Sequence, residues 1–329
     1  MTEGPSVSWW ITAALAFAAM SPASHTRAQS YPNKPVRILI GYAPGGAADF
    51  TARLLAQRLQ MPELLGQPVI VESRAGAGST IAIKAGATAA PDGYTLTLIS
   101  DGGLVQSARG AKLGYDIEKD MAPISFAAVG PFVLTVHPLV PAHNAKELIA
   151  LAKRQPGKLT YGSSGNGSAQ HLAGEFFQSL TGTKLLHVAY KGGAQAAVAT
   201  ASGEVEMSFT TVPSVASLLK GGKLRLIGVT TERRASFMPD VPTLQELGVK
   251  DYEYSAWYGV LGPAGLPKEL VARLGAAIKT AVSTAEIREA FNQGGLDPFT
   301  NTPEQFRTFI HNQLAKSAQL VKAAGIPAD

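Results

Sequence analysis

Glycines and hydroxyl side chains gather in four short segments of this sequence, each placed between a β-branched run and a helix-like run. The segments are residues 44–47, 100–103, 162–168 and 190–193. Glycine lets backbone N–H groups approach a ligand closely, and a helix N-terminus offers unpaired N–H donors and about half a positive charge. Each segment could therefore bind a small anion without an arginine. The glycines could also serve tight turns alone, but recurrence in both halves of the chain favours a shared cleft.

The same segments lack the residues that nucleotide binding and catalysis require. Two G-x4-G pairs have P-loop spacing, but Ala47-Ala48 and Ser168-Ala169 stand where Lys and Ser/Thr must hold phosphate and Mg²⁺. No G-x-S-x-G nucleophile elbow is present, and the histidines lack the H-x3-H and H-E-x-x-H spacings. The sequence therefore predicts no catalytic residue, no metal site and no cofactor.

His171 and Asp49 are titratable residues that follow two of these segments closely. His171 follows Ser168 by three residues, where a histidine is more often a local hydrogen-bond partner than a base. Its place beside the expected cleft makes it a candidate ligand contact. Asp49 is expected to support the first turn of its helix through the helix dipole. A serine hydrolase that uses Ser164 or Ser168 with His171 is the alternative function, and activity on carboxylic esters would reveal it.

Strands alternate with helices along most of the chain, which predicts an α/β fold with a mostly parallel sheet covered on both faces. We expect strands over residues 36–40, 68–72, 94–99, 159–161, 186–190, 205–209 and 224–230. We expect helices over residues 47–60, 145–154 and 168–180, an alanine-rich helix that ends before Pro91, and a nearly all-helical tail over 267–324. Residues 132–138 and 255–261 have the pattern of strands that cross between two lobes.

The crossings and the length predict two lobes, since 329 residues suffice for two α/β cores. We assign residues 29–131 and 253–329 to the first lobe and residues 132–252 to the second. Ligands of open α/β sheets bind at the carboxyl ends of the strands. The cleft should therefore lie between the lobes, where the glycine-rich segments meet.

Residues 1–28 have the features of a signal peptide. The apolar run over residues 9–20 is too short to span a bilayer comfortably, and Thr26 and Ala28 form a small-x-small cleavage site before Gln29. Glu3 precedes the apolar run where a positive charge is usual, so a short anchor helix is the alternative. We expect export to the periplasm. The absence of cysteine removes disulfides and thiolate metal sites.

Charge and composition describe an ordinary globular protein. Hydrophobic residues make up 46% and charged residues 16% of the chain, and the net charge is +5. A basic protein could bind nucleic acid, but the basic residues form no long run, and a modest positive field also helps to collect small anions. We expect no nucleic-acid partner; a steep salt dependence of DNA binding would indicate one.

A series of longer motifs follows in order along the chain. They include P-G-G-x-x-D-x-x-A-R at 44–53, L-G-Q-P-V-I-V-E at 65–72, P-D-G-Y-T-L at 91–96, P-G-K-L-x-Y-G-S-S-G at 156–165 and P-D-V-P-T at 239–243. In these motifs the chain resembles the substrate-binding proteins of tripartite tricarboxylate transporters, the Bug family of periplasmic receptors. The resemblance runs from about residue 31 to residue 326.

The resemblance implies a two-lobed periplasmic-binding-protein fold (type II, Venus flytrap) with the ligand cleft between the lobes. It implies a monomeric receptor that delivers a small carboxylate to the membrane components of a transporter, and holds it through backbone amides, hydroxyls and bridging waters. Together with the glycine-rich segments it gives the candidate ligand contacts, which are Tyr42, Gly45, Gly46, Ala47, Ala48, Ser100, Asp101, Ser163, Ser164, Ser168, His171, Lys191 and Thr210.

Two departures from the family pattern bear on the ligand. Asp101-Gly102 stands where the family has a small residue followed by Gly-Thr, and Thr210 and Thr211 replace an acidic residue. An amino-acid ligand brings an ammonium group, whose burial requires a paired carboxylate. We therefore expect a di- or tricarboxylate or an aromatic acid to bind, and aspartate and glutamate not to bind. Asp101 is the one acidic residue near the expected cleft.

Overall fold

The computed structural model describes residue 1 and residues 31–110 and 112–323. Contacts within the chain divide it into Met1–Asn33 and Lys34–Asp329, and every element below belongs to the second unit. Apart from Met1, the predicted signal peptide (residues 1–28) lies outside the described residues, as does the end of the predicted first lobe (residues 324–329). Among the described residues, no helix is both long and apolar enough to cross a membrane.

A mixed sheet forms the centre of Lys34–Asp329, in the order β2-β1-β3-β9-β4-β7-β5-β6. Strands on the first side are β1 (Val36–Ile40), β2 (Val69–Ser73), β3 (Thr95–Ser100) and β9 (Ser255–Pro263). Strands on the second side are β5 (Thr160–Ser163), β6 (Leu186–Ala189), β7 (Met207–Thr211) and β8 (Arg225–Val229). The β1–β2, β1–β3, β5–β6 and β5–β7 pairs are parallel, as the alternating pattern predicts.

Strand β4 (Met121–Val136) connects the two sides. Its residues 121–131 pair with β9, and its residues 132–136 pair with β7 and β8. The predicted crossing at 132–138 therefore begins too late. Residues 121–131 were not predicted as a strand because they contain Pro123, Gly130 and Pro131. Proline and glycine usually mark strand ends. The pairing with β9 shifts register between Pro123 and Ser125. The division into lobes stays a prediction.

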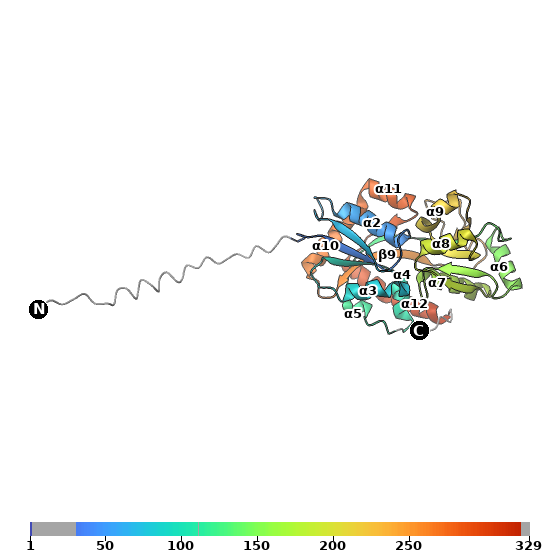
Figure 1. Cartoon of the computed structure of the whole chain (residues 1–329), viewed down its shortest axis with the longest axis horizontal. Helices are drawn as coiled ribbons and strands as arrows, with labels where there is room; N and C mark the ends of the chain where they lie inside the picture. The colour runs from blue at the N-terminus through green and yellow to red at the C-terminus, as the bar shows by residue number, and fades with distance from the viewer. Residues whose placement is uncertain (2–30, 111, 324–329) are drawn as a thin grey trace. The chain divides into compact units, whose positions relative to one another are not determined.

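Helices surround both halves of the strand order, the first and second sides that β4 connects (Figure 1). Around the first side lie α2 (Ala47–Leu59), α3 (Thr80–Ala87), α10 (Lys268–Ser283) and α11 (Ala285–Gln293). Around the second side lie α6 (Ala145–Arg154), α7 (Ala169–Thr181), α8 (Gly193–Ser202) and α9 (Val212–Lys220). The remaining elements are η1 (Ala77–Ser79), α4 (Asp101–Ala108), α5 (Ile117–Asp120), β10 (Asp297–Pro298) and α12 (Pro303–Ala323).

Helix α6 shows why the sequence places these elements well. Asn144 caps it by accepting a hydrogen bond from the Glu147 N–H, and Leu148 and Leu151 are buried while Lys153 is exposed. Cap and periodicity agree, so both predicted ends of the helix are confirmed. The nearly all-helical tail expected over 267–324 is interrupted, because β10 pairs with β4.

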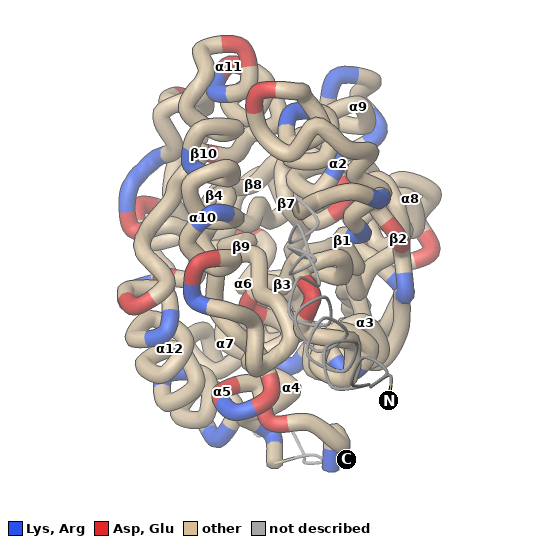
Figure 2. Tube along the Cα trace, turned by 90° about the vertical axis from the view of Figure 1, so that its left-hand side faces the viewer, with Lys and Arg blue, Asp and Glu red and all other residues tan. Residues whose placement is uncertain are grey.

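Aromatic packing fixes the first side of the sheet. The Phe126 and Trp257 ring centroids lie 5.5 Å apart in an edge-on arrangement, and Phe306 is fully buried beside them. A second apolar cluster on the other side includes Val133, Val215 and Val229. Figure 2 shows that the Lys and Arg positions of the described residues are scattered over many elements.

Candidate functional site

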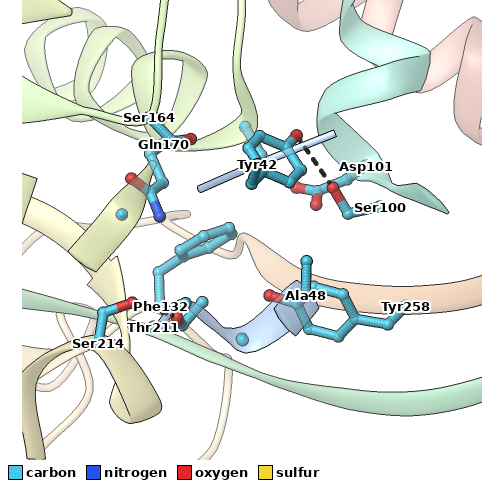
Figure 3. Close-up of a pocket in the computed structure, with 14 residues that line it drawn as sticks. Tyr42, Ala48, Ser100, Asp101, Phe132, Ser164, Gln170, Thr211, Ser214 and Tyr258 are labelled. Carbon is cyan, nitrogen blue, oxygen red and sulfur yellow. Dashed lines mark hydrogen bonds between the residues drawn. The ribbon is translucent and has the colours of Figure 1, made fainter. Parts of the chain in front are cut away.

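A small cavity lies at the carboxyl ends of β3, β5 and β7, between the two sides of the sheet. Its volume is about 30 Å³. The described residues that line it are Tyr42, Gly46, Ala47, Ala48, Ser100, Asp101, Phe132, Ser164, Ala169, Gln170, Gly193, Thr211, Ser214 and Tyr258 (Figure 3). Among these residues Asp101 alone carries an ionisable carboxyl, and none is Lys, Arg or His.

Helix N-termini surround this cavity. Helices α2, α4, α7, α8 and α9 each contribute a cap or first-turn residue to its wall. No side chain caps α2, α4, α8 or α9, whereas Ser168 caps α7. Each helix start has partial positive charge and N–H donors that its own helix does not use. The cavity is therefore suited to an anion although no cationic side chain lines it.

The turn before α2 is held by two hydrogen bonds to Asp49. Gly45 has φ +89°, a conformation that strains side chains other than glycine, and its N–H donates to Asp49 Oδ2 at 3.1 Å. Arg53 Nε donates to Asp49 Oδ1 at 2.9 Å. The predicted support of the helix start by Asp49 is confirmed, and the contact keeps Gly46 at the cavity wall.

Tyr42 approaches the start of α4. Its hydroxyl lies 3.2 Å from Ser100 Oγ (Figure 3). A Cβ at position 102 would lie 2.3 Å from Tyr42 Oη, so a larger residue than glycine would displace this hydroxyl. Burial raises the pKa of Tyr42 to about 12, against weaker lowering by the bond to Ser100. The phenol therefore stays protonated at neutral pH and can donate to an anion.

Asp101 is the first residue of α4 and is 6% exposed. Its Oδ2 is buried and has no hydrogen-bond partner among the described residues. Burial raises the pKa of Asp101 to about 8, while the Tyr254 hydroxyl and the N–H groups of Asp101 and Gly102 lower it by less. At neutral pH this carboxyl is therefore mainly uncharged.

The second side of the sheet contributes neutral polar groups. Thr211 Oγ1 and Ser214 Oγ lie 3.1 Å apart at the start of α9. Gln170, near the start of α7, is 6% exposed, and its Oε1 has no partner within the described part of the chain. Figure 3 shows Gln170 and Ser164 together, away from Ser100 and Asp101.

The structure brings part of the predicted contact set to this cavity. The predicted residues that line it are Tyr42, Gly46, Ala47, Ala48, Ser100, Asp101 and Ser164. The predicted residues that do not line it are Gly45, Ser163, Ser168, His171, Lys191 and Thr210.

Buried hydrogen bonds engage the side chains of Ser163 and Ser168. Both serines are fully buried: Ser163 Oγ lies 2.6 Å from His187 Nε2, and Ser168 Oγ accepts from the His171 N–H at 3.2 Å. The Ser168 hydroxyl, a predicted ligand contact, therefore serves as the cap of α7 in this structure. His171 stacks on His187 with ring centroids 3.8 Å apart, and its Nδ1 accepts from the Gly167 N–H at 3.0 Å.

Three more predicted contacts, Lys191, Gly45 and Thr210, lie outside the cavity lining. Lys191 is exposed, and its carbonyl oxygen accepts from the Ala43 N–H at 3.1 Å, which joins the turn after β1 to the turn after β6. Gly45 is exposed and precedes the lining residues of α2. Thr210 is fully buried in β7, and its Oγ1 has no partner among the described residues.

Several lining residues were missed by the sequence argument. They are Phe132, Ala169, Gln170, Ser214 and Tyr258. Thr211 was named only as a departure from the family pattern, and Gly193 only as part of a turn. Pro213 could have revealed the start of α9, because proline is common in a first helical turn. Phe132 and Tyr258 lie in the predicted crossings, but no periodicity says that they face a cavity.

A family described as "Tripartite tricarboxylate transporter family receptor" matches residues 51–326. The chain belongs to this family. BugT of Bordetella pertussis is 34% identical over 305 residues, which is 92% of this chain and 93% of BugT. A protein encoded in the gbd 5′ region of Cupriavidus necator is 35% identical over 315 residues, 96% of this chain and 94% of that protein.

Three solved structures are similar to this one. A periplasmic transporter structure has a TM-score of 0.86 and 36% identity, covering 91% of this chain and 100% of that chain. An R. palustris protein solved with adipate has a TM-score of 0.87 and 30% identity over the same shares. MatC of Rhodopseudomonas palustris with bound malate has a TM-score of 0.83 and 26% identity, covering 88% and 100%. The predicted family and two-lobed fold are confirmed.

Proposed function

We propose that this chain is a periplasmic receptor that binds a small carboxylate in the cavity of Figure 3 and delivers it to the membrane components of a tripartite tricarboxylate transporter. The observation that carries the proposal is the set of helix N-termini around a cavity without a cationic side chain. Adipate and malate in the related structures support a carboxylate ligand. Export through residues 1–28 is part of this proposal.

The proposed contacts follow from the lining. One carboxylate group meets the backbone N–H groups at the start of α2, near Gly46 and Ala47, where the dipole favours negative charge. Hydroxyls of Ser164, Thr211 and Ser214 complete the binding from the second side of the sheet. Ser163, Ser168 and His171 stabilise the turn between β5 and α7 through the hydrogen bonds described above.

Ligand entry requires the cavity to enlarge. A volume of about 30 Å³ holds one or two water molecules, whereas a dicarboxylic acid is several times larger. The bonds from Ala43 N–H to Lys191 O and from Gln106 Nε2 to Asn166 O join the two sides beside the cavity. We propose that these bonds break when the sides separate about β4 and β9, and that they form again, or are replaced, around the ligand.

The contacts favour binding without a chemical step. A serine nucleophile needs its hydroxyl to donate to a nearby base. Ser168 Oγ instead accepts from the His171 backbone, and the His171 ring accepts from the Gly167 N–H. This is the arrangement of a helix cap, and it gives no support to a hydrolase that uses Ser168 with His171.

A thermal-shift panel tests the proposal. A ligand that binds only the folded state adds about 2.7 kcal/mol at a hundredfold excess over Kd. We expect adipate, malate or another simple di- or tricarboxylate or aromatic acid to raise the melting temperature by several degrees, and aspartate and glutamate not to. Melting curves that no acid of these classes shifts would contradict the receptor function.

A further inference from the structure

Asp101 is out of place in an anion site. Its side chain lies in the wall of the binding cavity, where every other described lining residue has an uncharged or weakly acidic side chain. The same residue also lines a second cavity of about 360 Å³, whose wall includes Tyr254, Trp257 and Lys316. Asp101 therefore separates the binding cavity from a larger one, with an oxygen that has no partner among the described residues.

The described residues that line the binding cavity with Asp101 include no cationic side chain. Tyr42, Tyr254 and Tyr258 surround it with phenol hydroxyls, and burial keeps these phenols protonated. On α12, Lys316 Nζ bonds to Glu253 Oε2 at 3.0 Å, and both side chains are partly exposed at the wall of the second cavity.

Two further titratable groups lie on the adjacent helices. Directly after α4, Arg109 Nη1 donates to Gln106 Oε1 at 3.0 Å. On α7, which packs against α4, the His171 ring accepts from the Gly167 N–H. Both groups thus already hydrogen-bond to polar atoms other than the Asp101 carboxyl.

A bound carboxylate and a charged Asp101 in the same cavity would repel each other strongly. Buried like charges a few ångströms apart interact strongly, and one of them usually takes up a proton. A protonated Asp101 would supply one O–H donor, whereas a charged Asp101 could only accept. Burial already places its pKa at about 8, so the neutral form prevails at pH 7.

We propose that Asp101 is a specificity-determining residue that enters the complex as a neutral carboxylic acid and donates its O–H to a carboxylate oxygen of the ligand. This inference rests on the proposed carboxylate-binding function. Binding above neutral pH then takes up a proton from solvent. The affinity for a simple dicarboxylate is nearly constant between pH 6 and 7 and falls as Asp101 ionises. An ammonium-bearing ligand gains nothing from a neutral partner.

The expected size of the effect follows from the pKa. With a pKa of about 8, the apparent dissociation constant scales as one plus the ratio of charged to neutral Asp101. The affinity should therefore be about tenfold lower at pH 9 than at pH 7. Near pH 9 close to one proton should be taken up for each ligand bound, measurable from binding enthalpies in buffers of different ionisation enthalpy.

Calorimetric titration with malate and with adipate between pH 6 and 9 tests the inference. The wild type should show the tenfold loss and the proton uptake. Asp101→Asn, which keeps a donor but does not titrate, should show neither, whatever its absolute affinity. Asp297→Asn is the matched control: burial also raises the pKa of Asp297, but this residue in β10 does not line the cavity. It should keep the wild-type pH dependence.

The outcomes separate the inference from the function. Binding of either acid that is constant from pH 6 to 9 would overturn the inference and leave the receptor function intact, as would an unchanged pH dependence in Asp101→Asn. Aspartate binding that strengthens with pH and disappears in Asp101→Asn would make the residue a charged ammonium partner, which also overturns it. Failure of both acids to bind at any pH would refute the proposed ligand class and the inference together.

Discussion

Replacing Gly46 with alanine should block the proposed anion site while the fold survives. Gly46 caps α2 with φ −92° and ψ 177°, a conformation open to alanine. A Cβ at this position would lie 3.7 Å from Ser214 Oγ, an ordinary contact distance. The methyl group would nevertheless enter a cavity of about 30 Å³, between the starts of α2 and α9.

The magnitude follows from the contact that the methyl group displaces. A hydrogen bond to a charged group contributes roughly 1.5–3 kcal/mol, so its loss should weaken binding about 10- to 150-fold. The melting temperature of the unliganded protein should stay the same or rise slightly, because Gly→Ala at a compatible conformation stabilises by about 0.4–1 kcal/mol.

Calorimetry with malate and adipate, alongside melting curves without ligand, measures both effects. Gly275→Ala is the matched control: this glycine lies in α10, away from the cavity lining, and its added Cβ would be 3.5 Å from Ile124 O. It should keep the wild-type affinity. If Gly46→Ala binds within about twofold of the wild type, the ligand does not lie at the start of α2 and the placement is refuted.

Three further predictions concern the supports of the site. Ser168→Ala should lower the unfolding free energy by about 1 kcal/mol through loss of the α7 cap and reduce affinity less than Gly46→Ala; melting curves and calorimetry would show a reversed order if Ser168 touches the ligand. Asp49→Ala should lower the free energy of unfolding by about 1–2 kcal/mol and weaken malate binding, because the Gly45 N–H loses its acceptor. An unchanged unfolding free energy in denaturant titration and an unchanged malate affinity would contradict this. Burial lowers the pKa of His187 to about 4, so the contribution of neutral His187 to folding stability is complete above about pH 6.5 and is lost as the pH falls toward 4. His187→Asn should therefore reduce the loss of unfolding free energy at acid pH by on the order of 1 kcal/mol. Parallel pH–stability curves for the variant and the wild type would count against this.

Local signals were enough to predict most elements. The cap at Asn144 and the apolar period of 145–154 define α6, and the first-turn carboxylate of Asp49 identifies the start of α2. Strand β4 shows the opposite case, because its prolines and glycine resemble a strand end unless the neighbouring strands are known. Strand pairing is a long-range property, so no local pattern could have placed residue 121 in the sheet.

The sequence by itself determined that glycine-rich turns would join strands to helix starts, because glycine spacing and β-branched runs act over a few residues. Only the tertiary structure decided which atoms of those turns reach the cavity. Ser163 and Ser164 are adjacent, yet the first bonds to His187 and the second lines the cavity. Asp101 was visible as an acidic residue, but its uncharged state depends on burial by residues from distant strands. Burial and pairing belong to the packed assembly, so they follow from the folded chain as a whole.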